Sequence, residues 1–394
     1  MKRATLLLLF ILTQTSLAQW EPCGKLSGDL ITGIIVNGSS IYAGTYGNGV
    51  FLSSNNGASW IAKNNGLTDL NVETIHSNGN SIFAGTDSGI FLSTNNGNSW
   101  TAKNTGLKTL TVQAIGTSGT TVFAGTLGGG IFVSTDNGNN WTAKNSGLTV
   151  LNIQAICVNG TTVFAGSDNL STAGGVSVST NNGNSWNSMN SGLTDLHVQT
   201  IAATGSTIYA GTNSGVFIST NSGMNWTSTT LPKLYVNAIV VSGATVFAGT
   251  TKGVYVSTNN GNSWYVNNGG LTELFVLEIA VKGNTVFAGM LTGEVFQADL
   301  SELATGVEET AELTGQIQVF PLPATDYLTV MKTNYSLNQT AYTSVFILNI
   351  LGEVVKTIPV NNSPSFQIDI SDLSAGVYYL IIGSELKMFV KQSC

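Results

Sequence analysis

The amino-acid sequence predicts an all-β protein, and three observations carry this prediction. Only 9% of the 394 residues are charged, too few for the solvated polar faces that surface helices need. The chain has 46 Gly and 6 Pro, and it is rich in Asn, Ser and Thr, as is usual for short strands joined by tight turns. A unit of about 40 residues recurs along residues 19–300, which predicts a seven-bladed β-propeller with four-stranded blades.

Three segments recur in each unit. A segment of the type (I/V)(F/Y)AG places its glycine at Gly44, Gly85, Gly125, Gly166, Gly211, Gly249 and Gly289. A segment of the type STNNGNSW ends at Trp60, Trp100, Trp141, Trp186, Trp226 and Trp264. The third segment, NxGLTxLxVxxI, lies between them. Apolar runs separated by Gly and Asn turns are expected to be the four strands of a blade.

The mature N-terminal strand is expected to close the ring. The seventh unit lacks a Trp segment, whereas Trp20 opens a run in which residues 20–35 align with residues 60–75, so that Ile35 matches Ile75. Pairing this strand with the last blade removes two open sheet edges, which would otherwise favour aggregation. A stacked solenoid is the alternative, but it would not need its first strand to complete its last repeat.

Residues 1–18 are predicted to be a signal peptide. Lys2 and Arg3 precede an apolar run, and Ser16-Leu17-Ala18 offers the small residues that signal peptidase reads. Because a bilayer span takes about 20 apolar residues, no transmembrane segment is predicted. Arg3 is the sole arginine, so the exported chain is expected to contain none. The formal net charge is −7 without a basic run, which argues against nucleic-acid binding.

The chain has three cysteines, Cys23, Cys157 and Cys394. An odd number at such irregular spacing is not a disulfide framework. No disulfide within the repeats is therefore expected. Cys157 is predicted to be a small buried residue, because other copies place small residues at its position: Gly116, Ala202 and Ala280.

The Trp segment resembles the Asp-box, or bacterial neuraminidase, repeat S-x-D-x-G-x-x-W. Asp136 alone keeps the acid, and asparagine replaces it at Asn55, Asn95, Asn181, Asn221 and Asn259. In a hairpin between outer strands the side-chain oxygen need only accept backbone N–H groups, which Asn does as well. The resemblance implies a sialidase-like propeller whose boxes lie opposite the ligand site, so the boxes are assigned a structural role.

The C-terminal residues 317–394 are predicted to form a separate small β-sandwich, joined by an acidic linker at residues 301–316. The motifs Pro321-Leu322-Pro323 and Leu373-Ser374-Ala375-Gly376-Val377-Tyr378, with a closing Lys391, resemble the type A sorting domain of the type IX secretion system of Bacteroidota. The family usually opens with Pro-Asn-Pro. The resemblance implies that the type IX machinery is a partner and that the protein is extracellular or attached to the outer cell surface.

Two enzyme classes can be weighed from the residues. Sialidases bind the substrate carboxylate with three arginines, so the arginine-free mature chain is not expected to be a sialidase. Inverting glycoside hydrolases, which other Asp-box propellers resemble, need two carboxyl groups about 6.5–9.5 Å apart. Glu73 and Glu278 lie on inner strands, and four acids share one loop position: Asp29, Asp69, Asp195 and Glu273. Other copies place Thr109, Val150 and Lys233 there, as expected of a solvated loop.

The first candidate binding site is a ring at the start of the inner strands. It contains Glu73, Gln113, Gln154, Gln199 and Asn237, with Gly33 and Leu277 as exceptions. Amides at these positions are suited to bind sugar hydroxyls or the end of a peptide. The alternative is the polar, water-filled channel lining that any propeller needs.

The second candidate is a group of aromatic side chains, each one residue before the Val of the NxGLTxLxVxxI segment. It comprises His197, Tyr235 and Phe275, where other copies carry Ile31, Asn71, Thr111 and Asn152. Such rings suit a sugar face, with packing between blades as the alternative. The longest insertion, residues 168–174, is expected to border this rim. Since His76 and His197 fall at different positions of different blades, no metal site and no cofactor is predicted.

Together these observations predict a non-enzymatic, extracellular binding or adhesion module for glycan or protein, with no catalytic residue assigned. The alternative is a glycoside hydrolase of Asp-box propeller type that is not a sialidase. A role like that of propellers resembling the photosystem II assembly factors is disfavoured, because those use basic patches that this acidic chain lacks.

Overall fold

The computed structural model describes residues 20–26, 30–168, 174–304, 317–320, 326–332, 344–349, 354–359, 365–382 and 385–391. The chain divides into two compact units, Met1–Glu308 and Glu309–Cys394. The expected signal peptide, Asp29, Cys394 and most of the insertion after Asp168 lie outside the described residues.

The described part of the first unit forms seven four-stranded antiparallel sheets, which confirms the predicted propeller. Blade 1 contains β2 (Ile31–Asn37), β3 (Ser40–Thr45), β4 (Gly49–Ser53) and β5 (Ile61–Ala62), and blade 2 contains β6 (Val72–Asn78), β7 (Ser81–Thr86), β8 (Gly89–Ser93) and β9 (Thr101–Ala102). Blade 3 contains β10 (Val112–Ser118), β11 (Thr121–Thr126), β12 (Gly130–Ser134) and β13 (Thr142–Ala143).

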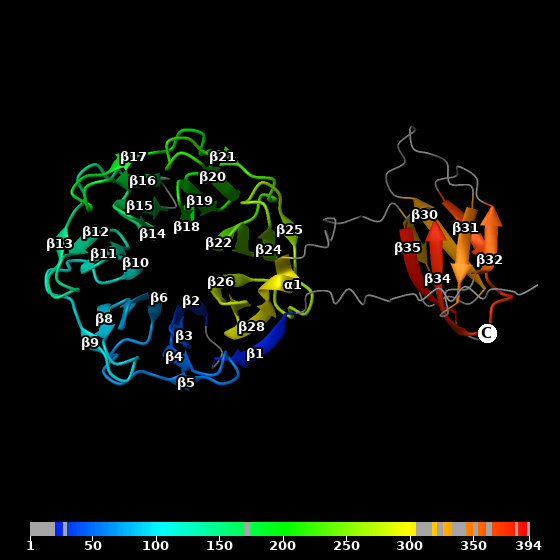
Figure 1. Ribbon diagram of the computed structural model, residues 1–394, viewed down its shortest axis with the longest axis horizontal. Coiled ribbons are helices and arrows are strands. Elements are labelled where there is room, and N and C mark those ends of the chain that lie inside the picture. Colours follow the sequence, from blue (N-terminus) through cyan, green and yellow to red (C-terminus); the bar gives the residue numbers. More distant parts are fainter. Residues whose placement is uncertain are drawn as a thin grey trace, which may run out of the picture. The chain divides into compact units, whose positions relative to one another are not determined.

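The remaining blades repeat this order around the ring (Figure 1). Blade 4 contains β14 (Ile153–Asn159), β15 (Thr162–Ser167), β16 (Gly175–Ser179) and β17 (Asn187–Ser188), and blade 5 contains β18 (Val198–Thr204), β19 (Thr207–Thr212), β20 (Gly215–Ser219) and β21 (Thr227–Ser228). Blade 6 contains β22 (Val236–Ser242), β23 (Thr245–Thr250), β24 (Gly253–Ser257) and β25 (Tyr265–Val266). Blade 7 contains β26 (Val276–Lys282), β27 (Thr285–Met290), β28 (Glu294–Asp299) and β1 (Glu21–Lys25).

The N-terminal strand closes the ring as predicted. Strand β1 pairs antiparallel with β28, with Glu21 opposite Gln297 and Lys25 opposite Glu294, and Figure 1 shows the two strands side by side. Trp20 is 2% exposed. Because β1 covers the free edge of β28, blade 7 reaches the four strands of the other blades without an exposed β28 edge.

The alignment of the first inner strand needs a correction of one residue. Ile34 pairs with Ala43 as Ile75 pairs with Ala84, so Ile34 rather than Ile35 corresponds to Ile75. The loop before β2 is therefore one residue shorter than its counterparts. The blade 1 members of the two candidate groups are Thr32 and Leu30, and not Gly33 and Ile31.

The Ser-to-Trp turns join the third and fourth strands of the blades. In blade 2, the Ser93 Oγ accepts the Gly97 N–H at 2.9 Å, and the Asn95 Oδ1 accepts the Ser99 N–H at 2.9 Å. The Asp136 Oδ1 accepts the Asn140 N–H at the same distance. Asparagine thus makes the bond that the single aspartate makes, as the sequence predicts.

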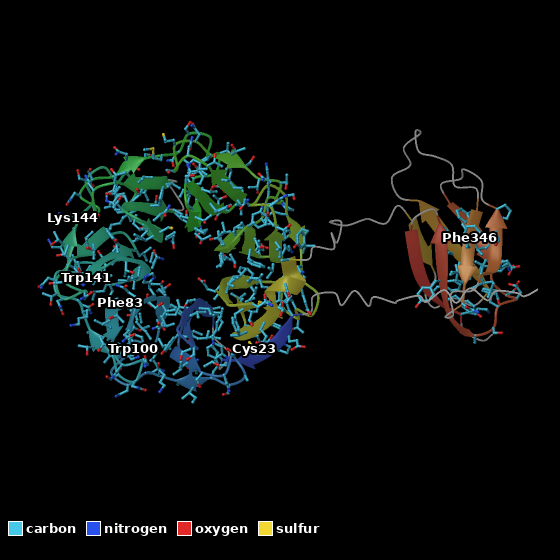
Figure 2. The ribbon with its side chains drawn as sticks, viewed as in Figure 1. Cys23, Phe83, Trp100, Trp141, Lys144 and Phe346 are labelled. Carbon is cyan, nitrogen blue, oxygen red and sulfur yellow. The ribbon has the colours of Figure 1, made fainter. Side chains whose placement is uncertain are left out.

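The tryptophans of these turns join neighbouring blades. Trp141 packs in one cluster with Phe83 of blade 2 and Phe132 of blade 3 (Figure 2). Its indole N–H donates to the Lys103 carbonyl at 2.8 Å. Each such side chain buries apolar area and satisfies its polar atom at once, which is the usual requirement for a buried Trp.

Blade 7 is followed by the short helix α1 (Leu300–Ala304). Leu303 is fully buried in the core cluster of blades 6 and 7, and its carbonyl accepts the Tyr265 hydroxyl at 2.5 Å. The first residues of the expected linker thus pack on the propeller, and residues 305–316 lie outside the described part.

The second unit contains two small sheets. One has β29 (Ile317–Phe320), β30 (Tyr327–Lys332) and β33 (Ser365–Asp369), and the other has β31 (Ser344–Leu348), β32 (Val354–Pro359), β34 (Gly376–Ile382) and β35 (Glu385–Lys391). Both sheets contribute to one buried cluster, which includes Val330, Ile347 and Leu380. This is the small sandwich that the sequence predicts.

Cys23 and Cys157 are both free thiols. Cys23 is buried, whereas Cys157 is only half-buried and packs at the edge of the cluster of blades 4 and 5. Cys157, predicted to be a small buried residue, is thus only partly buried, and this burial raises the pKa of its thiol to about 11.

Candidate ligand-binding site

The seven innermost strands surround a cavity of about 260 Å³ on the propeller axis. Each of these strands begins at the face that carries the loops between the second and third strands, which we call the open face. The Ser-to-Trp turns lie on the opposite face. All five polar residues of the predicted ring line the cavity: Glu73, Gln113, Gln154, Gln199 and Asn237.

Glu278 also lines this cavity, and the sequence analysis placed Leu277 there instead. Each inner strand has a register shift at its second residue, between Val276 and Glu278 in blade 7 and between Val72 and Thr74 in blade 2. A bulge sets two residues of one strand opposite one of its partner. Two consecutive positions can thereby line the channel, and in blade 7 the carboxyl occupies the second.

Glu278 has no hydrogen-bond or ion-pair partner among the residues that the structure describes. The channel wall limits the hydration of its carboxyl group, and this burial raises the pKa of Glu278 from 4.5 to about 8. A carboxyl group in this state is neutral at pH 7. It becomes charged when a cation approaches or when the pH rises.

The second carboxyl of the cavity, Glu73, belongs to an acidic cluster. Burial, followed by the charges of Asp87 and Asp69, raises the pKa of Glu73 to about 7. The Asp87 carboxylate also accepts the Asn71 amide at 3.0 Å and the Tyr46 hydroxyl at 3.2 Å. The cluster thus fixes the orientation of Asp87 beside Glu73.

The amides of the ring differ in how they are held. The Gln199 amide donates to Asp168 at 2.6 Å and to Asn213 at 2.9 Å, and the Asn237 amide donates to the Val276 carbonyl at 2.7 Å. The Gln113 Oε1, in contrast, is buried and has no hydrogen-bond partner in the described structure. Unpaired buried acceptors are uncommon, so this atom is available to a donor from a ligand.

The second predicted group does not line the cavity. His197 binds Asp195 through Nδ1 at 3.0 Å, and its Nε2 lies 4.0 Å from Asp168, the first residue of the blade 4 insertion. Tyr235 and Phe275 are half-buried in the next two blades. Ring stacking among these three residues does not occur in the described structure.

The three described loop acids that share one position each accept a hydrogen bond within their own loop. The Asp69 and Asp195 carboxylates accept the N–H two residues on, from Asn71 and His197, and Glu273 does the same for Phe275. These bonds mimic a backbone turn. One oxygen of each carboxyl group thus stabilises its own turn, whereas Asp69 Oδ2 and Asp195 Oδ2 are buried without a hydrogen-bond partner in the described structure.

The open face also carries an apolar feature that the sequence analysis missed. Of the ten exposed large apolar side chains in the described propeller residues, eight lie in open-face loops, and each is at least 37% exposed. We call them the apolar rim, and they are Leu30, Tyr46, Leu70, Leu110, Leu127, Leu151, Leu274 and Leu291. The signal in the sequence was the second Leu of NxGLTxLxV, which we had assigned to an apolar strand.

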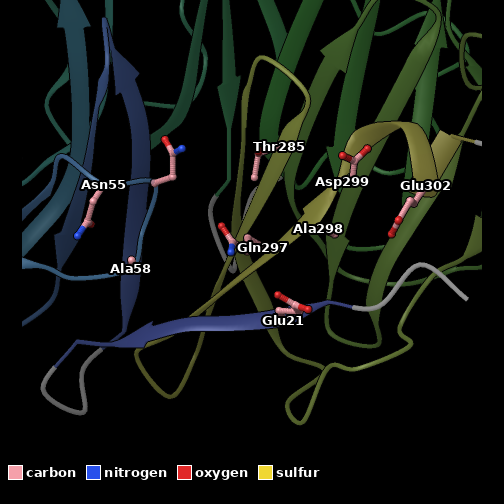
Figure 3. Close-up of a pocket in the computed structure, with 9 residues that line it drawn as sticks. Glu21, Asn55, Ala58, Thr285, Gln297, Ala298, Asp299 and Glu302 are labelled. Atoms are coloured by element: carbon pink, nitrogen blue, oxygen red, sulfur yellow. The ribbon is translucent and has the colours of Figure 1, made fainter. Parts of the chain in front are cut away.

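A larger cavity of about 470 Å³ lies where blade 1 meets blade 7, beside a Ser-to-Trp turn (Figure 3). It is lined by Glu21, Asn55, Asp299 and Glu302, among others. The Asp299 Oδ1 is already held by the Ser301 N–H at 2.8 Å and by the Asn284 amide at 2.6 Å. We therefore assign Asp299 a structural role at the junction of β28 and α1.

In the described ranges, no group of three or more His, Cys, Asp or Glu side chains is arranged to hold a metal ion. His76 hydrogen-bonds Thr117 at 2.9 Å, and burial lowers its pKa to about 4. None of the described helices is long and apolar enough to cross a membrane.

Comparison with known families identifies both units. Residues 30–162 and 150–274 match the DUF6242 beta propeller domain, and together the two matches cover more than half of the chain. The chain belongs to the DUF6242 beta propeller family. Residues 318–393 of this DUF6242 protein match the secretion system C-terminal sorting domain. This domain indicates that the type IX secretion system exports the protein to the cell surface or to the outside of the cell.

Solved structures share the fold of this DUF6242 propeller at low sequence identity. A GH74 enzyme from Niastella koreensis is 21% identical with a TM-score of 0.55, and the match covers 69% of this chain and 43% of that one. YCF48 bound to D1 peptide is 15% identical with a TM-score of 0.58. This match covers 71% of this chain and 95% of the YCF48 chain.

A third structure comes from a Bacteroidota species. The extracellular domain of the hybrid two component system BT3049 from B. thetaiotaomicron is 14% identical with a TM-score of 0.64, covering 95% of this chain and 57% of that one. The chain thus spans less than two thirds of the length of the GH74 enzyme and of the two component system. A search of curated proteins found no match.

Proposed function

We propose that this protein is an exported, non-catalytic binding module that recognises a protein partner through the open face of its propeller. One observation carries the proposal: the apolar rim, which lies on the loops of blades 7, 1, 2, 3 and 4, shares one face with the mouth of a polar cavity. Exposed apolar groups that gather on one face of a protein commonly mark an interaction site. Apolar contacts around a polar centre are also usual in ligand sites.

The chemistry of the rim favours protein over glycan. Seven of its eight members are leucines, and Tyr46 is the only aromatic among them. Leucines bury apolar area against apolar side chains, whereas sugars are usually gripped by flat aromatic rings. The half-buried Tyr235 and Phe275 do not form such a platform. A propeller of this fold in YCF48 holds a peptide, which supports the same use of the fold here.

A glycoside hydrolase is the second candidate, and the raised pKa of Glu73 favours it, since a general acid needs a carboxyl group that is protonated near pH 7. The reaction also needs a second carboxylate that is ionised. Burial raises the pKa of Glu278, the other carboxyl group of the cavity, as well. Asp69, a loop acid close enough to Glu73 to contribute to its raised pKa, holds its own turn through Oδ1.

The test compares two double variants of the full chain that alter exposed apolar residues, and the control pair is the more exposed of the two. Leu110→Asp with Leu151→Asp disrupts the rim, and Ile61→Asp with Met224→Asp is the control away from the open face. We expect cross-linking with mass spectrometry on intact cells to identify one partner that contacts open-face loops. Its affinity should fall at least about tenfold in the rim variant only.

Other outcomes would redirect the assignment. Glycan-array binding that the rim variant abolishes would make the ligand a glycan. Release of reducing sugar from polysaccharides, abolished by Glu73→Gln, would establish the hydrolase. Equal affinity in the rim and control variants would refute the proposed open-face site.

A further inference from the structure

We infer that the protein partner inserts a cationic group, either a lysine or arginine side chain or an amino terminus, into the axial cavity, where Glu278 and Glu73 receive it. This inference rests on the proposed function and names the chemistry of the partner. The apolar rim then packs against the residues on either side of the inserted group. Four properties of the cavity support it.

The first property is the charge of the lining. The cavity is lined by Glu73 and Glu278 and by neutral residues, without a lysine, arginine or histidine. The lysines Lys108, Lys233 and Lys252 lie in open-face loops outside this lining. Two half-buried carboxyl groups attract a cation more strongly, once ionised, than they would in bulk water. No described lysine or histidine of the chain forms an ion pair with Glu73 or Glu278.

The second property is the unpaired state of the acceptors. The Gln113 Oε1 is buried without a hydrogen bond, and the half-buried Glu278 has no protein partner among the described residues. A buried acceptor that lacks a donor costs free energy, and the ionised form of Glu278 is an acceptor only. An ammonium group brings three donors and a guanidinium five. A cationic group is therefore the ligand that supplies what this cavity lacks.

The third property is size. A cavity of about 260 Å³ compares with about 30 Å³ for each molecule of liquid water. It holds an extended side chain or the end of a peptide. The occupant is thus a single protruding group, and the rest of the partner rests on the rim.

The fourth property is the protonation of the two acids. Burial raises the pKa of Glu278 to about 8, and burial with Asp87 and Asp69 raises that of Glu73 to about 7. Tyr46 faces the same acidic cluster through Asp87. A bound cation favours the ionised carboxylate, so binding releases protons to the solvent. The affinity for a lysine or arginine side chain, which stays charged, must then increase as the pH rises through these values, whereas an amino terminus, with a pKa of about 8, loses its own charge over the same range.

The experiment selects from a displayed library of random peptides on the immobilised full-length protein. We expect enriched peptides to carry Lys, Arg or a free amino terminus next to apolar residues. One enriched peptide is then synthesised with Lys, citrulline and Glu at the cationic position, and its dissociation constants are measured by calorimetry at about pH 6, 7.5 and 9. The Lys peptide should bind at least about tenfold more tightly than the citrulline peptide, and increasingly so at higher pH.

The matched variants are Glu278→Gln in the cavity and Glu21→Gln on the exposed outer strand. The first should remove most of the preference for Lys and its pH dependence, and the second should change neither. Enrichment without a cation, or a preference that Glu278→Gln leaves intact, would overturn the inference while the proposed protein binding stands. A library without any rim-dependent enrichment would contradict both.

Discussion

The indole N–H of Trp20 donates to the carbonyl oxygen of Asn267 at 3.0 Å, across 247 positions of the sequence. This bond repeats the one that Trp141 makes to Lys103 within the continuous chain. The N-terminal residue pair Trp20 and Glu21 thus takes the place of the Trp turn that the seventh unit lacks. The ring is closed by the same contact that Trp100, Trp141, Trp186 and Trp226 make to the preceding blade.

Trp20→Ala is expected to lower the free energy of unfolding by about 3 to 5 kcal/mol, as usual for a buried Trp. Trp60→Ala serves as the matched control, because Trp60 has the same place in its turn but is half-buried. It should cost about 1 to 2 kcal/mol. Urea denaturation followed by circular dichroism measures both. Equal losses would show that Trp20 contributes no more to the ring than a half-exposed copy does.

Gly66→Ala is expected to destabilise the propeller more than Gly79→Ala does. Both glycines have positive φ, +83° and +59°, so each substitution carries the left-handed penalty of about 1 to 2 kcal/mol. A Cβ at Gly66 would meet the Trp100 carbonyl oxygen, whereas one at Gly79 has no atom within 4 Å. The difference should be about 1 to 3 kcal/mol. Melting temperatures that coincide would contradict the close approach at Gly66.

Asp136→Asn is expected to leave stability at neutral pH nearly unchanged and to reduce its loss in acid. Hydrogen bonds from Asn140 and Ser134 lower the pKa of Asp136 to about 2 from 3.8. The native state therefore favours the ionised form, and this stabilisation is lost as the pH falls from about 4 to 2. Asn95→Asp should show the reverse change. Thermal melts of the three proteins from about pH 2 to 7 measure it, and three parallel curves would contradict the account.

The repeats made the fold predictable from the sequence, since seven copies of one pattern and Trp20 left little freedom for another closure. The alignment failed by one residue at Thr32, because the loop before β2 is shorter and strand register depends on pairing with β3. A repeat alignment compares residue types only. Which residue of a strand faces the channel is fixed by the register of its hydrogen bonds with the neighbouring strand.

The candidate site was predicted in part. The polar ring was found because Glu73 and Gln113 recur one residue after a buried Val, and the cavity is lined by both. Glu278 was left out of the ring because a bulge cannot be inferred from alternation. The rim was missed for a related reason: Leu70 and Leu110 extend an apolar run in the sequence, but they lie before the strand begins.

Glu278→Gln is expected to stabilise the protein at high pH. Burial raises the pKa of Glu278 to about 8 in the folded state, against 4.5 ordinarily. Between these values the unfolded chain has released a proton that the native state still binds, so the wild-type free energy of unfolding falls as the pH rises. Glutamine has no proton to release, and the variant should escape this fall.

The two proteins should therefore have similar stability near pH 4.5 and should differ by a few kcal/mol near pH 9. Glu73, with its own raised pKa, is present in both and cancels in the difference. Urea denaturation at about pH 4.5, 7 and 9 measures the effect, and Glu21→Gln, at an exposed position on β1, should follow the wild type. If the stability of Glu278→Gln also follows that of the wild type at every pH, the Glu278 carboxyl group is hydrated in the folded protein. The cavity then does not hold this group in the neutral state. The proton-coupled binding of a cation depends on that neutral state.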